Sequence, residues 1–251
     1  MINLAILPSI ILFVIVWRAD KIEKEPASLL LKLFFLGALT IISAVIIGQL
    51  GEMVFQSFLD TESMVYIAID NFLLTALVEE GGKYFVLKKG SWKHPAFNYT
   101  FDAVVYAVVV SLGFATFENI LYVMEGGVST AITRGILSVP GHVIDAIFMG
   151  CYYGIAKKME AEGNEAGMRS NLVKALLIPT LLHGFYDFCL STGYDAFLII
   201  FFVFEIVITI LAIIKFKGLS RSDTQIIQEN TTISEPLEYK EDEQDNEKQD
   251  F

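Results

Sequence analysis

A series of long apolar runs constrains the fold of this chain more than any other feature. The runs cover about residues 2–17, 28–50, 64–87, 101–123, 132–156, 172–190 and 195–216. Each has roughly 16 to 25 residues, the length that an α-helix needs to cross a bilayer core of about 30 Å. Within lipid the backbone must satisfy its own hydrogen bonds, which favours helices. We therefore predict an all-α, polytopic membrane bundle of about seven transmembrane helices.

Basic residues alternate between the segments that connect these runs. Lys or Arg occurs in 18–27, 88–100, 157–174 and after 214, whereas 51–63, 124–131 and 191–194 contain neither. Because basic connections stay on the cytoplasmic side, this alternation predicts an N-terminus outside and a cytoplasmic C-terminus. Lys32, Lys83 and Arg134 fall inside the runs, away from these connections.

The negative charge is concentrated at the end of the chain. The whole chain has a formal charge of −11, and its last 33 residues contain ten acids and three bases. This stretch has few aromatic residues and no apolar period, which is typical of a disordered segment. We predict a transmembrane domain over residues 1–217 and a disordered acidic cytoplasmic tail over 218–251. No basic patch suggests nucleic-acid binding.

The third apolar run contains two adjacent acids and a base, Glu79, Glu80 and Lys83. Lys83 follows them by four and three residues, so all three share a helical face. Two close carboxylates do not readily both ionise. One of them could therefore exchange a proton with water, as a general base does. A structural ion pair that orients helices is the alternative interpretation.

Glu118 and Tyr122 are four residues apart at the end of the fourth run. The predicted topology places Glu118 in the outer part of the membrane. It could be a catalytic partner or a supporting residue near the interface, and the sequence leaves both open.

Two histidines in the apolar runs each have an acid nearby. His142 precedes Asp145 by three residues, and His183 precedes Asp187 by four, so each pair can meet on one helical face. A neighbouring carboxylate fixes the tautomer of a histidine. We predict that the two histidines join Glu79 and Glu80 in one water-filled cluster.

Carboxylates and histidines in such a cavity suit hydrolysis by a glutamate-activated water. His142, His183 and Glu80 could instead bind zinc, since two histidines and a glutamate are typical ligands of catalytic zinc. The zincin motif His-Glu-x-x-His is absent. Cys151 and Cys189 are interpreted as small packing residues. A proton-coupled transporter and a non-catalytic binding protein are further alternatives.

At these residues the sequence resembles the PrsW family of intramembrane proteases, which is similar to the CAAX prenyl endopeptidases. The resemblance covers about residues 1–216, and the matching blocks are Glu79-Glu80-x-x-Lys83, Phe101-Asp102 to Tyr106, Ser111 to Glu118-Asn119 and Tyr122, His142 with Met149-Gly150, and Pro179 through His183 to Tyr186-Asp187. The acidic tail departs from the pattern.

The resemblance implies site-1 cleavage of a single-span anti-sigma factor in the bacterial cytoplasmic membrane, at the start of a stress response. It implies that Glu79, Glu80 and His183 are needed for activity, with Glu118 and His142 as further site members. We expect a supporting set of Lys83, Asn119, Tyr122, Asp145 and Asp187. The resemblance leaves zinc open, and we favour a metal-free glutamate mechanism because the paired glutamates supply a base.

Overall fold

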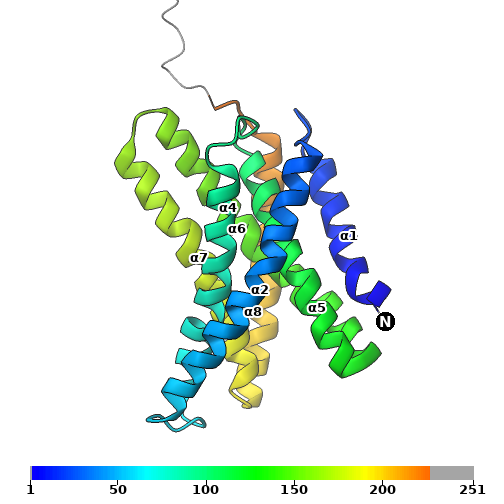
Figure 1. Ribbon diagram of the computed structural model, residues 1–251, viewed down its shortest axis with the longest axis vertical. Coiled ribbons are helices and arrows are strands. Elements are labelled where there is room, and N and C mark those ends of the chain that lie inside the picture. The colour runs from blue at the N-terminus through cyan, green and yellow to red at the C-terminus, as the bar shows by residue number, and fades with distance from the viewer. Residues whose placement is uncertain (1, 227–251) are drawn as a thin grey trace, which may run out of the picture.

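The protein is all-helical, as predicted. The computed structural model describes residues 2–226 and contains no β-strand within that range. Its elements are α1 (Ile2–Ala19), α2 (Ala27–Gln56), α3 (Met64–Ile69), the π-helix η1 (Asp70–Ala76), α4 (Leu77–Ser91), α5 (Asp102–Ile136), α6 (Ser138–Ala161), α7 (Glu165–Ser191) and α8 (Asp195–Arg221). Figure 1 shows them as one bundle of long helices.

Five helical stretches are long and apolar enough to cross a membrane. They are Ile2–Ala19, Ala27–Gln56, Asp102–Ala161, Glu165–Ser191 and Asp195–Arg221. The stretch Asp102–Ala161 contains both α5 and α6. The predicted third span, 64–87, corresponds to α3, η1 and α4, which follow one another without a break. It is not among the five because η1 divides it into shorter helices and because Asp70, Glu79 and Glu80 interrupt its apolar residues. The chain is thus a multi-pass membrane protein by helix length and composition.

The connecting segments gather at two opposite ends of the bundle (Figure 1). At one end, the Ser220 hydroxyl donates to the Ala19 carbonyl at 2.6 Å, and the Trp92 indole donates to Glu160 at 2.9 Å. The basic connections 18–27, 88–100 and 157–174 all lie at this end, which we call the basic end. The short turns after α2 and α7 lie at the other end.

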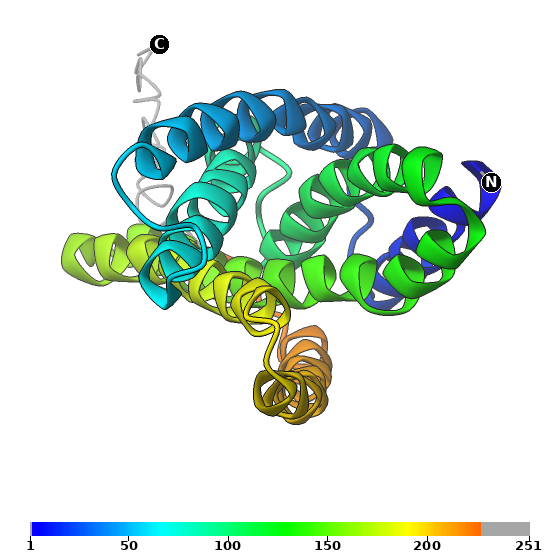
Figure 2. The same ribbon diagram turned by 90° about the horizontal axis from the view of Figure 1, so that it is seen from below.

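The chain reverses within α5, at Gly127. Its φ of 73° and ψ of −153° are not helical, and residues 128–136 then lead back toward α6 (Figure 2). The predicted connection at 124–131 is therefore one glycine within an otherwise helical segment. Glycine suits this position because it adopts a positive φ without steric cost.

The predicted boundary between membrane domain and tail is too early. α8 ends at Arg221, and Asp223 then accepts hydrogen bonds from the Thr100 hydroxyl at 3.0 Å and the Phe101 N–H at 2.8 Å. The N–H of Ile226 also donates to the Asn98 carbonyl at 2.7 Å. These contacts order residues 218–226 against the basic end. The rest of the predicted tail, 227–251, lies outside the described residues.

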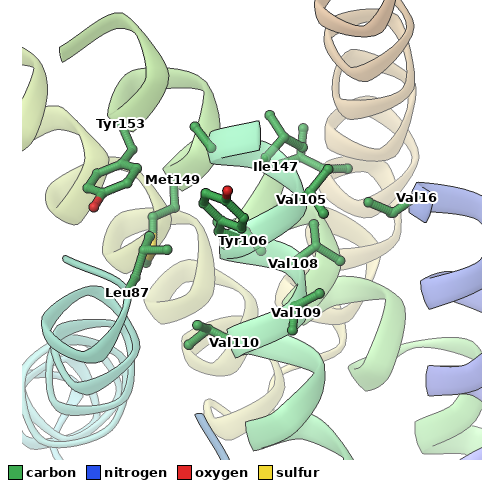
Figure 3. Packing of buried hydrophobic residues seen from close by; sticks show 14 of the residues in the cluster. Val16, Leu87, Val105, Tyr106, Val108, Val109, Val110, Ile147, Met149 and Tyr153 are labelled. Carbon is green, nitrogen blue, oxygen red and sulfur yellow. The ribbon is translucent and has the colours of Figure 1, made fainter. Parts of the chain in front are cut away.

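The first half of α5 is the centre of the bundle. Residues 102–116 are all buried, and Figure 3 shows Val105, Tyr106 and Val108 among side chains of α1, α4 and α6. Small residues let neighbouring helices approach closely. A Cβ on Gly113 would overlap the Phe34 carbonyl oxygen of α2, and one on Gly150 of α6 would lie 2.6 Å from Val104 Cα.

This packing makes Gly113 intolerant of even one methyl group. We expect Gly113→Ala to lower the free energy of unfolding by about 1–3 kcal/mol, because α2 and α5 must separate. Thermal unfolding in detergent micelles measures the change. Gly218→Ala on α8 is the control, since its Cβ would meet nothing within 4 Å. Equal melting temperatures for the two variants would contradict the close α2–α5 contact.

The basic end also holds buried acids. Asp20, in the loop after α1, is 2% exposed, and its Oδ2 has no hydrogen-bond partner among the described residues. Burial raises the pKa of Asp20 from 3.8 to about 6, against the opposing effect of Lys24. Burial also raises the pKa of Glu25, which accepts a hydrogen bond from the Tyr106 hydroxyl.

The Asp20 carboxyl should make stability depend on pH. Its folded pKa lies above the unfolded value, so its contribution is fully present below about pH 4 and is lost as pH rises through about 6. We expect Asp20→Asn to be more stable than the parent at pH 7, by on the order of 1 kcal/mol, with the gain shrinking toward pH 4. Melting temperatures between pH 4 and 7 test this. A gain that does not change with pH would contradict it.

Candidate active site

The site begins at the junction between η1 and α4. Glu79 and Glu80 stand in the first turn of α4, directly after the π-helical segment. π-helical turns are rare and frequently accompany functional sites. Glu80 is 1% exposed and Lys83 is fully buried, so the charges predicted from sequence do lie inside the bundle.

Lys83 is the centre of the polar cluster. Its Nζ lies 2.7 Å from Glu80 Oε1, 3.5 Å from Glu79 Oε2 and 3.2 Å from His142 Nδ1. The ammonium group also lies 4.1 Å from the centre of the Phe114 ring on α5. A buried ion pair needs such additional contacts to offset desolvation. One lysine on α4 thereby binds α5 and α6 as well as its own acids.

His183 lies between carboxylates on two helices. Its Nδ1 is 2.9 Å from Glu80 Oε1, and its Nε2 is 3.1 Å from Asp187 Oδ2 and 3.9 Å from Glu79 Oε2. The contact with Asp187 is the one expected from their spacing of four residues. The two histidine rings meet edge to face, with centroids 5.3 Å apart.

His142 has partners that differ from the prediction. Its Nε2 lies 2.9 Å from Glu118 Oε2, and its Nδ1 faces Lys83. Both ring nitrogens are therefore occupied by other helices, and no hydrogen bond joins His142 to Asp145 within residues 2–226. The predicted pairing with Asp145 is wrong. Glu118, for which two roles were open, contacts His142 directly.

Arg134 is a site residue that the sequence reasoning missed. Its Nη2 donates to Glu118 Oε2 at 2.6 Å, and its guanidinium group lies 4.0 Å from the centre of the Tyr122 ring. Its Nε is buried without a hydrogen-bond partner in the described part of the chain. The signal was present, since Arg134 is one of the few bases that lie inside an apolar run. A reversal at 124–131 was predicted, but not that it returns Arg134 to Glu118.

Asn119 does not belong to the site. Its side-chain amide donates to the Ala5 carbonyl at 2.8 Å, so it joins α5 to α1. The prediction that it supports the catalytic cluster is wrong. It directly follows Glu118, but consecutive residues of a helix face different directions.

The cluster opens into a polar cavity of about 340 Å³. Its walls include Glu79, Glu118, His142 and His183, and also Asp145, Asp187, Tyr122 and Arg134. Glu79 Oε2 has no hydrogen-bond partner among the described residues, although it is buried beside Lys83. This carboxylate can therefore accept a proton from a molecule in the cavity.

Two glutamates and two histidines of the cluster are residue types that bind zinc. One ligand atom from each of Glu79, Glu80, His142 and His183 lies within 4.8 Å of the others. In both histidines Nδ1 faces the cluster, while Nε2 faces Glu118 or Asp187. A carboxylate on the outer nitrogen is typical of zinc-bound histidine. Lys83 supplies a competing positive charge at the same place.

Comparison with known proteins gives one consistent result. The family described as "PrsW family intramembrane metalloprotease" matches residues 25–214. "Protease PrsW" of Oceanobacillus iheyensis is 35% identical over 212 residues, which cover 84% of this chain and 92% of that protein. The Clostridioides difficile protein of the same name is 34% identical over 82% of this chain and 85% of its own. The Bacillus subtilis protein of that name is 34% identical over 194 residues, which cover 76% of this chain and 82% of that protein. No solved structure matches.

Loss of the Lys83 charge should destabilise the whole bundle. We expect Lys83→Met to lower the free energy of unfolding by about 3–5 kcal/mol, because buried carboxylates lose their counter-ion. Lys89→Met, which removes an exposed lysine from the same helix, is the control and should change little. Thermal unfolding in detergent measures both. Equal melting temperatures would show that the acids do not depend on Lys83.

Proposed function

The chain belongs to the PrsW family of intramembrane proteases, and we propose that it hydrolyses its substrate in the cavity between α4, α5, α6 and α7. The observation that carries this proposal is the place of Glu79, which lines the cavity beside His142 and His183. Its Oε2 has charged neighbours, Lys83 Nζ at 3.5 Å and His183 Nε2 at 3.9 Å, but no hydrogen-bond partner among the described residues. Glu79 therefore keeps the capacity to take up a proton, and the cavity that it lines, of about 340 Å³, is large enough to hold water. The site is thus suited to deprotonate water next to a bound peptide.

In this mechanism Glu79 is the general base. It takes a proton from water, and the resulting hydroxide attacks the peptide carbonyl. Negative charge then develops on the carbonyl oxygen, and the cationic side chain of Arg134 and the imidazole of His183 line the same cavity and can stabilise it. The C–N bond of the intermediate then breaks, and Glu79 returns the proton to the leaving amine. Glu80 and Lys83 hold His183 and His142 in position.

The family description includes a metal, and the donor set is compatible with one. Glu80, His142 and His183 would hold zinc, which when bound supplies Lewis-acid chemistry and lowers the pKa of a water ligand. We favour the metal-free mechanism because the ammonium group of Lys83 already supplies a positive charge between the two glutamates. Glu79 serves as the base in both cases.

The substrate and the topology are part of the proposal. We propose seven transmembrane segments, with α3, η1 and α4 forming the third, an outside N-terminus and a cytoplasmic acidic tail. The grouping of the basic connections at one end supports this topology (Figure 1). We propose a bacterial cytoplasmic membrane location and site-1 cleavage of a single-span anti-sigma factor near its extracytoplasmic side. The transporter alternative gains no support, because the relatives are proteases.

Cleavage by the purified protein tests the mechanism. We expect Glu79→Gln to reduce the cleavage rate of a reconstituted single-span anti-sigma factor by roughly 10²–10⁴-fold, because the base is lost while the shape is kept. Glu62→Gln, in the turn after α2, is the control and should leave the rate unchanged. Mass spectrometry of the products measures both. Full activity of Glu79→Gln would contradict its role.

Metal dependence is tested in the same assay. We expect cleavage to survive a zinc chelator. Loss of activity on chelation that added zinc restores would replace the metal-free mechanism by the zinc mechanism. Absence of cleavage by the folded parent protein would contradict the proposed substrate class.

A further inference from the structure

A long groove runs along the outside of the bundle between α1, α6 and α8. It encloses about 790 Å³ and is lined mostly by apolar side chains. α8 stands away from the other helices (Figure 2) and buries only Phe201, Ile208 and Ala212 among its 27 residues. The groove closes at the basic end, where the Ser220 hydroxyl bonds the Ala19 carbonyl.

This groove lies next to the catalytic cavity. Leu137 lines both of them. A small pocket, which we call the passage, lies between them, and it is lined by Glu205 and Ile144 of the groove and by Asp145 and Tyr186 of the cavity. Two further apolar grooves, one between α1, α5 and α6 and one between α1, α2 and α5, share no lining residue with the cavity.

The groove also has polar groups in its wall. Glu205 lies in the middle of α8 and faces the groove beside Thr209. No hydrogen bond or ion pair joins the Glu205 carboxylate to another residue within 2–226. A carboxyl group at this depth is costly unless it has a partner or a function. A lipid chain offers it no hydrogen-bond donor, whereas a peptide that is unwinding offers backbone N–H groups.

We propose that this groove receives the transmembrane helix of the substrate, and that Glu205 accepts hydrogen bonds from substrate N–H groups where the helix opens toward the cavity. The proposal rests on the proposed function. A helix must unwind before its peptide bond is accessible, and N–H groups released in lipid need acceptors. Glu205 in the groove provides the first acceptor, and Asp145 and Tyr186 in the passage provide the next ones toward the cavity.

Two neighbouring residues of α8 allow a matched test. Ile206 and Val207 are both exposed, at 62% and 50%, but only Ile206 lines the groove. Each is replaced in the full-length protein by the photo-crosslinker p-benzoylphenylalanine, with the reconstituted single-span anti-sigma factor as probe. We expect crosslinks to the substrate from position 206 and few from position 207.

Kinetics provide a second measurement. Ile206→Trp fills the groove and should raise KM for the single-span substrate about tenfold, whereas Val207→Trp should not. Glu205→Gln keeps an acceptor and should retain more activity than Glu205→Leu. The groove proposal alone would be overturned if the parent protein cleaves the substrate but Ile206→Trp leaves KM unchanged and position 206 crosslinks no more than position 207. A parent protein that binds but never cleaves would contradict the proposed function instead.

Discussion

The buried ammonium group of Lys83 is the interaction on which the rest of the site depends. It contacts Glu80 on its own helix and His142 on α6. From these two residues the contacts continue to His183 on α7 and to Glu118 on α5. Most of these side chains are buried in the bundle, so an unpaired charge among them would be costly. The cluster therefore fixes the relative positions of four helices and prepares the site at the same time.

Close packing of α5 makes this cluster possible. Its buried first half places the Phe114 ring beneath Lys83, and the Ser111 hydroxyl donates to the His142 carbonyl at 2.8 Å. On the opposite side, α7 approaches η1 so closely that a Cβ on Gly184 would lie 2.5 Å from Phe72 Cδ1. Because Gly184 follows His183, this approach brings the histidine to Glu80. The apolar core and the polar site are thus built by the same helices.

The sequence predicted the features that depend on neighbouring residues of one helix. The apolar runs had to be helices, and Lys83 and His183 each contact the acid expected three or four residues away. Contacts between different helices could not be predicted from spacing along the chain. Asp145 has the correct spacing to meet His142, but Glu118 and Lys83 approach the ring from other helices and occupy both nitrogens. Arg134 was missed because its contact with Glu118 depends on the chain reversal at Gly127.

An intramembrane protease must combine a wet cavity with an entrance for a helix that arrives through lipid. Here the two are separated by Leu137 at the start of α6, and carboxyl groups mark the passage between them. α1, α6 and α8 all run toward the basic end, where the groove is closed. A helix lying in the groove would therefore remain intact toward the basic end and unwind near Leu137. With the proposed topology, the peptide bond that reaches Glu79 belongs to the outer part of the substrate helix, which explains why cleavage would occur near the extracytoplasmic side.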